Sequence, residues 1–514
     1  MAVARNVVVI TVDQYRGDSL SYLGHRVAQT PAIDQLCSRG VCFANHWSVT
    51  APCGPGRASL YTGTYAHHHR SVLNGTPLDA RFTNIALEAR AAGYDPVLFG
   101  YTDTSIDPRT VAEDDARLAS YEGVLPGFRP VVHDPFELGG LEWGRWLAER
   151  GYDVPSRPHD LYAPDTSYPG AGEHAPSWAP TLFRAEDSES AFLTEKAIEW
   201  LGRLEEPGFF LHLSYIRPHP PYRNPAGYHD LCSADEVDFL VGQATREAER
   251  ASHPLARMLL GLPAVASPDD EGARRQLRAT YHGMQAEVDT QLGRFFDFLE
   301  QSGLASETLI LLTSDHGEMG GDHWGFQKAG YWDESFRVPL VVVDPSEEAE
   351  ATRGRVVEDF TESVDVAPSL LEWLGLPLPR QFDGRSLLGF VRGADPTNWR
   401  TAAHFEWSFR NPATRRAETA FAIPSAHCSL AVLRTAGAKY VQFAADPELL
   451  PPIYFDLLAD PDQLDDLSAS KERAPDRLLL AEELSRWRMR YEDEELASLL
   501  LTADGVVSAG DPWR

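Results

Sequence analysis

Positive charge is scarce in this chain. Its 46 Lys and Arg residues stand against 76 Asp and Glu residues, which gives a formal net charge of −30. Because nucleic-acid binding requires a basic patch that neutralises phosphates, this composition argues against a nucleic-acid partner. The negative field would also repel a small anionic substrate. A bound divalent cation is the simplest means of reversing that field locally.

Cysteines are few, and no apolar run is long. The five cysteines, at positions 37, 42, 53, 232 and 428, are odd in number and lack the spacing of a disulfide framework, which favours a reduced protein. The apolar run 6–12 is too short to span a bilayer, and its flanks lack the features of a signal peptide. We therefore expect a cytoplasmic protein without a membrane partner.

Short β-branched runs bounded by turn residues alternate with helical stretches. Such runs are typical of buried parallel strands, and the alternation predicts an α/β sheet that helices cover on both faces. The expected strands are 7–12, 96–100, 208–215, 308–313 and 338–343, and the expected helices include 82–92, 190–204 and 276–302.

Two regions depart from this alternation. Residues 112–187 are rich in Pro, Gly and aromatic residues, and we expect a long irregular insertion there that could form an interface arm. Beyond residue 376, short strand-like runs precede an acidic stretch over about 474–500 that reads as a long helix. We predict a catalytic domain over 1–376 and a C-terminal α+β domain over 377–514, with an antiparallel sheet and a terminal helix.

Polar residues follow three of the expected strands. Asp13, Tyr101 and the pair Asp315-His316 each come directly after an apolar run. Ligands of open α/β sheets bind beyond the carboxyl ends of the strands, where these side chains would meet. Two carboxylates that converge there repel each other unless a cation joins them, which favours a metal site. A turn or helix-capping role remains the alternative for each residue.

The segment 52–60 (PCGPGRASL) reads as a turn that opens a helix. Cys53 would lie near the helix N-terminus, a position that lowers a thiol pKa and attracts anions, with Arg57 one turn later. A free cysteine in a turn is the alternative. The tract 67–69 (HHH) suggests a metal site, but three adjacent imidazoles cannot easily face one ion, so we expect a surface segment.

Residues 53–57 (CGPGR) match the Cys-x-Pro-x-Arg signature of type I sulfatases and their relatives in the alkaline phosphatase superfamily. Other segments that resemble this family follow in the expected order: 13–14 (DQ), 62–63 (TG), 217–221 (RPHPP), 314–318 (SDHGE), 365–368 (DVAP), 383–387 (DGRSL) and 454–457 (YFDL). The resemblance implies an alkaline-phosphatase-like central mixed, mostly parallel sheet flanked by helices, with a smaller C-terminal α+β domain.

Within the family, 322–328 (DHWGFQK) and 331–335 (YWDES) resemble the branch of phosphonate monoester hydrolases, phosphodiesterases and promiscuous arylsulfatases. Typical arylsulfatases have Gly-Lys-Trp-His where 100–103 reads GYTD, so Tyr101 replaces a lysine and Asp103 a histidine. Losing the lysine disfavours a dedicated sulfatase. Gln14 replaces the second carboxylate of the usual Asp pair. The branch commonly forms dimers of dimers, so we expect a homo-oligomer, a dimer or a tetramer.

The resemblance also implies the site. In this family the cysteine is oxidised by a formylglycine-generating or equivalent maturation enzyme, and the hydrate of the resulting formylglycine is the nucleophile. One divalent ion, Mn²⁺ or Ca²⁺, would have as its ligands Asp13, Gln14, the modified Cys53, Asp315 and His316. The further catalytic residues would be Arg57 on the hydrate, His219 and Lys328 on the transferring or leaving oxygens, Asn74 and Tyr101 on the non-bridging oxygens, and Asp103.

The predicted function is metal-dependent hydrolysis of small anionic esters, namely sulfate monoesters, phosphonate monoesters and phosphodiesters. One alternative is a phosphatase or phosphomutase-type enzyme of the same superfamily that uses an unmodified nucleophile, for which Thr50 is available. A second metal-ligand set, which that alternative needs, is not evident. The other alternative is a non-catalytic binding homologue.

The formylglycine prediction can be tested by mass spectrometry. The peptide that contains Cys53 should be lighter by roughly 18 Da in active protein, because a thiol is replaced by an aldehyde. Fully active protein that carries only the unmodified thiol would contradict the prediction.

Overall fold

An eight-stranded sheet forms the centre of the computed structural model, which describes residues 5–205, 208–493, 496–497 and 499–508. Its strand order is β10-β2-β9-β8-β1-β7-β5-β6. β9 runs antiparallel to both of its neighbours, whereas the other neighbouring pairs are parallel. This confirms a mixed, mostly parallel sheet. The strands are β1 (Asn6–Val12), β2 (Val41–Phe43), β5 (Val97–Gly100), β6 (Arg129–His133), β7 (Phe210–Tyr215), β8 (Thr308–Thr313), β9 (Leu340–Val343) and β10 (Arg355–Val357).

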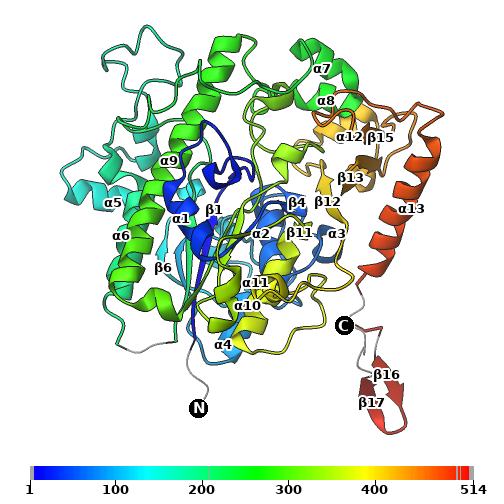
Figure 1. The fold of residues 1–514 in the computed structure, drawn as a ribbon, viewed down its shortest axis with the longest axis horizontal. Coiled ribbons are helices and arrows are strands. Elements are labelled where there is room, and N and C mark those ends of the chain that lie inside the picture. The colour runs from blue at the N-terminus through cyan, green and yellow to red at the C-terminus, as the bar shows by residue number, and fades with distance from the viewer. Residues whose placement is uncertain (1–4, 206–207, 494–495, 498, 509–514) are drawn as a thin grey trace.

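Helices cover both faces of this sheet (Figure 1). Alternate side chains of the fully buried β1 enter two cores: Val8 and Ile10 face helices α1, α6 and α9, whereas Val7 and Val9 face α2, α4 and α10. Burial on both faces explains why β1 reads as a continuous apolar run. The helices are α1 (Pro31–Arg39), α2 (Cys53–Thr62), α3 (Ala66–His69), α4 (Ile85–Ala91), α5 (Leu141–Glu149), α6 (Glu189–Leu201), α7 (Arg246–Ser252), α8 (Pro254–Leu259), α9 (Glu271–Gln301), α10 (Val366–Leu374), α11 (Leu388–Val391), α12 (Arg416–Phe421) and α13 (Ala474–Arg490).

A second sheet of five strands has the order β15-β14-β13-β12-β4. Four of them come from the C-terminal part of the chain: β12 (Ala402–Ser408), β13 (Ser429–Thr435), β14 (Ala438–Phe443) and β15 (Ile453–Asp456). The fifth, β4 (Thr50–Ala51), precedes α2 and pairs in parallel with β12. The smaller C-terminal sheet is thus confirmed, while the division of the chain at residue 376 stays a prediction.

The terminal helix is shorter than predicted. α13 ends at Arg490, and the last two residues of the predicted helix, 499 and 500, belong to a hairpin of β16 (Leu499–Thr502) and β17 (Gly505–Ser508). Residues 494, 495 and 498 of the predicted helix lie outside the described residues. The run 492–495 is EDEE, and four adjacent carboxylates at the C-terminal end of a helix repel one another and the helix dipole. Figure 1 shows the hairpin apart from the body of the molecule.

The region 112–187 is not wholly irregular. It contributes the edge strand β6, which pairs in parallel with β5, and the helix α5, whose Trp143 and Trp146 enter the core beside α6. The apolar part of β6 is only two valines long, too short to be recognised as a strand. Among the described residues, no helix combines the length and hydropathy that would let it span a bilayer.

A buried ion cluster joins the two sheets. Glu362, at the end of β11 (Thr361–Glu362), accepts hydrogen bonds from Tyr65 and from the backbone N–H of His404. Arg400 lies 3.4 Å from the Glu362 carboxylate and donates to Asp365. Burial alone would raise the pKa of Glu362, but Arg400 and His404 lower it to about 2. The cluster therefore depends on the guanidinium of Arg400.

We expect Arg400→Ala to lower the free energy of unfolding by about 3–5 kcal/mol, because it leaves two buried carboxylates without their cation. Chemical denaturation at pH 7 measures the change. Arg486→Ala is the matched control, since Arg486 forms an exposed pair with Glu483 and should lose less than about 1 kcal/mol.

The same cluster predicts a pH dependence. The folded-state pKa of Glu362 lies below its usual 4.5, at about 2, so its stabilisation is present above pH 4.5 and is lost as the pH falls toward 2. The stability difference between wild type and Arg400→Ala should shrink over that window. A difference that stays constant from pH 7 to pH 3 would contradict this account.

Candidate active site

Two strand ends and one helix start meet at the carboxyl edge of the large sheet. Asp13 follows β1, Asp315 and His316 follow β8, and Cys53 is the first residue of α2. All four side chains are buried, and one ligand atom from each lies within 4.8 Å of the others. The Sγ atom of Cys53 is 3.2 Å from Nε2 of His316. The structure thus brings together four of the five predicted metal ligands.

Arg57 lies one turn along α2 from Cys53 and is fully buried. Its Nε atom donates to Asp315 at 3.0 Å, and a terminal nitrogen donates to Asp13 at 3.2 Å. The other terminal nitrogen donates to the carbonyl oxygen of Tyr101 and to Oγ of Ser214. Since its donors are engaged by fixed groups, Arg57 holds the two carboxylates in place.

The protonation states suit a metal site. Burial raises the pKa of Asp13, but Arg57, His316 and Lys328 outweigh it and hold the pKa below its usual value, so Asp13 is a carboxylate. Burial lowers the pKa of His316. The Nδ1 atom of His316 lies 3.0 Å from the carbonyl oxygen of Gly317, which can only accept, so the neutral ring leaves Nε2 with a free lone pair.

One atom of this site lacks a partner. Oδ1 of Asp13 is buried and forms no hydrogen bond among the described residues. A buried carboxylate oxygen without a partner is costly, and a coordinated cation satisfies it. Carboxylate oxygens and an imidazole nitrogen are also ligands that divalent ions accept. The residues present therefore fit a divalent metal ion.

The thiol of Cys53 differs from the prediction. Its position at the start of α2 suggested a lowered pKa, but burial and the nearby Asp13 raise the pKa well above its usual value, and Lys328 compensates only in part. Burial, together with the nearby carboxylates, therefore outweighs the effect expected of a helix N-terminus. A protonated, buried thiol is a poor nucleophile. Its Sγ atom marks the position that an oxygen of a formylglycine hydrate would take.

Gln14, the fifth predicted ligand, adopts a left-handed backbone conformation with φ 63°. Its Oε1 atom accepts from Nζ of Lys328 at 2.6 Å, and its Nε2 atom donates to Glu318. Burial lowers the pKa of Lys328, but Cys53, Asp13, Asp315 and Glu318 raise it by a larger amount. The pKa of Lys328 therefore lies above its usual value, and this lysine keeps its charge.

Glu318 is a site residue that the sequence interpretation did not single out. It is fully buried and accepts hydrogen bonds from the Tyr222 hydroxyl at 2.8 Å and from the backbone N–H groups of Gly320 and Gln327. Glu318 also accepts a hydrogen bond from Gln14, so it fixes both Gln14, a candidate metal ligand, and the segment that carries Lys328. Its place in 314–318 (SDHGE), three residues after Asp315, was the available signal.

The predicted oxygen-binding residues surround Cys53 in different ways. The Tyr101 hydroxyl donates to Asp13, and its ring lies 4.3 Å from the Arg57 guanidinium, so its proton is already engaged. Oδ1 of Asn74 accepts from the backbone N–H of Gly54 at 2.9 Å, which leaves the amide NH₂ group available. Burial and Glu122 raise the pKa of Asp103 well above its usual value, which favours its protonated form.

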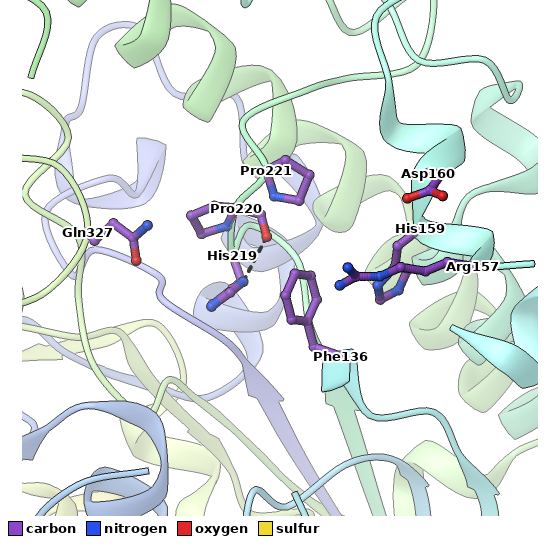
Figure 2. A pocket seen from close by; sticks show the side chains of 8 residues that line it. All are labelled: Phe136, Arg157, His159, Asp160, His219, Pro220, Pro221 and Gln327. Carbon is purple, nitrogen blue, oxygen red and sulfur yellow. Dashed lines mark hydrogen bonds between the residues drawn. The ribbon is translucent and has the colours of Figure 1, made fainter. Parts of the chain in front are cut away.

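His219 lies on the loop after β7 and lines a pocket of about 390 Å³. Its Nδ1 atom is 2.8 Å from the carbonyl oxygen of Pro220 and must donate to it (Figure 2). Burial and Lys328 lower the pKa of His219 well below its usual value, so the ring is neutral and its Nε2 atom is an acceptor. We call this cavity the His219 pocket; its lining residues are Phe136, Arg157, His159, Asp160, His219, Pro220, Pro221 and Gln327.

The predicted surface location of the tract 67–69 is wrong. All three histidines are buried, and each faces a different partner. His67 lies 3.2 Å from Glu406, His68 lies 3.1 Å from Asp383, and Nε2 of His69 is 2.9 Å from Oγ of Ser59. The short α3 is enclosed between α2 and the C-terminal part of the chain, which a local pattern of polar residues does not reveal.

Comparisons with known proteins agree with this site. The family model of the sulfatases matches residues 5–376. A second family model, that of the C-terminal region of N-sulphoglucosamine sulphohydrolase, matches residues 321–490. The chain belongs to the sulfatase family of the alkaline phosphatase superfamily, and it is a hydrolase of the EC 3.1 class. Membership of this family implies a formylglycine and a metal ion.

Among its relatives is PehA of Trinickia caryophylli, a multifunctional alkaline phosphatase superfamily protein, which is 39% identical over 98% of this chain and 99% of its own. The crystal structure of the phosphonate monoester hydrolase of Agrobacterium radiobacter is 41% identical, with a TM-score of 0.93 over 99% of this chain and 100% of that one. The phosphonate monoester hydrolase of Silicibacter pomeroyi is 36% identical, with a TM-score of 0.89 over 98% and 99%.

Glu318→Gln should weaken divalent-metal affinity or kcat/KM by about 10- to 100-fold, because it places an amide NH₂ group against that of Gln14 and disturbs a predicted ligand. Calorimetric titration with Mn²⁺ and steady-state kinetics measure the two effects. Tyr222→Phe is the control, since it removes one donor from the same carboxylate and should cost less than about tenfold. Unchanged affinity and kcat/KM in Glu318→Gln would refute the positioning role.

Proposed function

We propose that this protein hydrolyses small anionic esters of the sulfate monoester, phosphonate monoester and phosphodiester classes, with a formylglycine derived from Cys53 as its nucleophile. The observation that carries the proposal is the buried cluster of Asp13, Cys53, Asp315 and His316. PehA is described as multifunctional, and two similar structures are those of phosphonate monoester hydrolases. These two structures support phosphonate monoesters as substrates here, and membership of the sulfatase family supports sulfate monoesters.

The formal charges of the site favour a monoanionic substrate. Asp13, Asp315 and Glu318 contribute three negative charges, and Arg57 and Lys328 contribute two positive ones. A divalent ion changes the sum from minus one to plus one. Monoesters of sulfate and phosphonate and diesters of phosphate each carry one negative charge, so all three classes suit the same site.

Each side chain has a distinct role in this proposal. When bound, a divalent ion supplies the positive charge that activates an attacking oxygen and neutralises the ester. Asp13, Asp315, His316 and Gln14 would hold it, and oxygen donors with one imidazole suit Mn²⁺ or Ca²⁺. Arg57 keeps the two carboxylates at the correct separation, because its donors are directed at them.

Lys328 and His219 differ in what they can do for the leaving oxygen. Lys328 is charged and carries protons, so it can neutralise or protonate that oxygen. His219 is neutral, with its proton on Nδ1 directed at Pro220, so its Nε2 atom can only accept. We therefore assign proton donation to Lys328 and place His219 beside the substrate as an acceptor. We assign to Asn74, through its available amide NH₂ group, and to the protonated Asp103 the hydrogen bonds to the non-bridging oxygens. The hydroxyl of Tyr101 is engaged by Asp13, so Tyr101 holds that carboxylate instead.

The proposed partners follow from burial. Cys53 is only 4% exposed and the whole of α2 is buried, so a maturation enzyme has to reach the segment 53–57 before the chain has folded. We also propose a homo-oligomer, a dimer or a tetramer. The hairpin of β16 and β17 exposes Leu500, Leu501 and Val506, which favours contact with another surface.

Hydrolysis can be tested with an aryl sulfate, an aryl phosphonate monoester and an aryl phosphodiester that share one leaving group. Wild type should hydrolyse at least one of them, and the kcat/KM values rank the classes. Cys53→Ala should lose about three or more orders of magnitude on each ester that wild type hydrolyses while it still binds metal. Turnover that persists in Cys53→Ala would favour an unmodified nucleophile, and no turnover in wild type would favour a binding protein.

A further inference from the structure

The His219 pocket adjoins the candidate active site without containing any of its metal ligands. One wall is His219, and another is Gln327, the neighbour of Lys328 in the chain. The proposed function places His219 and Lys328 beside the leaving oxygen. The group attached to that oxygen, which is the alcohol part of the ester, would project into this pocket.

Aromatic rings and prolines make up most of the lining. The Phe136 ring lies 5.2 Å from the His219 ring and 5.0 Å from the His159 ring, measured between centroids. Pro220 and Pro221 complete this side of the pocket (Figure 2). The three rings are inclined to one another and give the pocket aromatic walls that another ring can contact, and about 390 Å³ accommodates a small ligand.

Two polar groups in the pocket lack partners among the described residues. Arg157 forms neither an ion pair nor a side-chain hydrogen bond there, and Figure 2 shows its guanidinium directed toward the Phe136 ring. Its stem crosses Gly139, where a Cβ atom would lie only 2.6 Å from Cγ of Arg157. His159 is 8% exposed, its Nε2 atom faces Glu189, and its buried Nδ1 atom has no hydrogen-bond partner.

Arg157 is exposed, and no carboxylate of the described residues forms an ion pair with it, so its guanidinium is available to an anionic group of a ligand. Many of the arginines have a carboxylate within reach, as Arg150 has in Glu195 and Arg184 in Asp187. Asp160 also lines the pocket, but no ion pair joins it to Arg157. Planar guanidinium groups bind carboxylates through paired hydrogen bonds.

We propose that the His219 pocket binds the alcohol part of the ester and selects aromatic alcohols that carry an anionic substituent, which pairs with Arg157. This inference rests on the proposed function and adds the substrate class to it. Phe136 and His219 contact the ring of the alcohol, and Arg157 contacts the substituent. Without such a cation, the net negative charge of the protein would disfavour a second negative charge on the substrate.

Two esters that differ only in the substituent test the proposal: 4-carboxyphenyl and 4-carbamoylphenyl phenylphosphonate. The first carries a carboxylate, and the second carries a neutral amide of similar shape. In wild type, kcat/KM should be about five- to tenfold higher for the carboxylate. Arg157→Ala should abolish this preference, and Arg157→Glu should reverse it. The ratio does not depend on the fraction of folded enzyme, so partial misfolding of a variant leaves it readable.

Arg145→Ala is the matched control, because it removes an exposed positive charge from α5 at a position outside the pocket lining. It should keep the wild-type ratio. Equal ratios in wild type, Arg157→Ala and Arg157→Glu would overturn the inference while the proposed function stands. If wild type hydrolyses neither ester nor any ester of the earlier panel, the proposed function fails, and this inference fails with it.

Discussion

Two carboxylates from different strands, Asp13 and Asp315, are buried at the same edge of the large sheet and share the guanidinium of Arg57. Like charges held this close, away from water, destabilise the folded chain unless positive charge balances them. Arg57 balances part of that charge and fixes the geometry, yet Oδ1 of Asp13 still lacks a partner. The site is therefore built for one more cation, and Lys328, Gln14 and Glu318 are arranged around that requirement.

The position of the nucleophile depends on both sheets. Cys53 begins α2, whose far side packs in the core beneath the large sheet, while the two residues of β4 just before it pair with β12 of the smaller sheet. Parallel pairing of Thr50 with Glu406 and of Ala51 with Trp407 fixes where α2 begins. The ion cluster of Arg400, Glu362 and Asp365 then holds the smaller sheet against the larger one. The C-terminal part of the chain thus determines where residue 53 meets Asp13 and His316.

The sequence predicted what local patterns encode. Continuous apolar runs located β1, β7 and β8, and the polar residues after β1 and β8 led to Asp13, Asp315 and His316. Features that depend on contacts between distant parts of the chain were either not predicted or predicted wrongly. The raised pKa of Cys53 comes from its burial and from carboxylates on other elements. The burial of 67–69 comes from enclosure by the C-terminal part, and Glu318 acts through Gln14, which is far away in sequence. The hairpin after α13 follows a cluster of like charges whose effect on helix length a periodic pattern does not show.

The central claim is that one divalent ion bridges Asp13, Asp315, His316 and residue 53. The most direct measurement is anomalous diffraction from crystals of the mature protein grown with Mn²⁺. The account predicts a single strong peak with ligand atoms of Asp13, Asp315, His316 and the modified residue 53 at about 2.0–2.6 Å. A peak that lies elsewhere, two ions in the site, or a residue 53 that points away from Asp13 would contradict it.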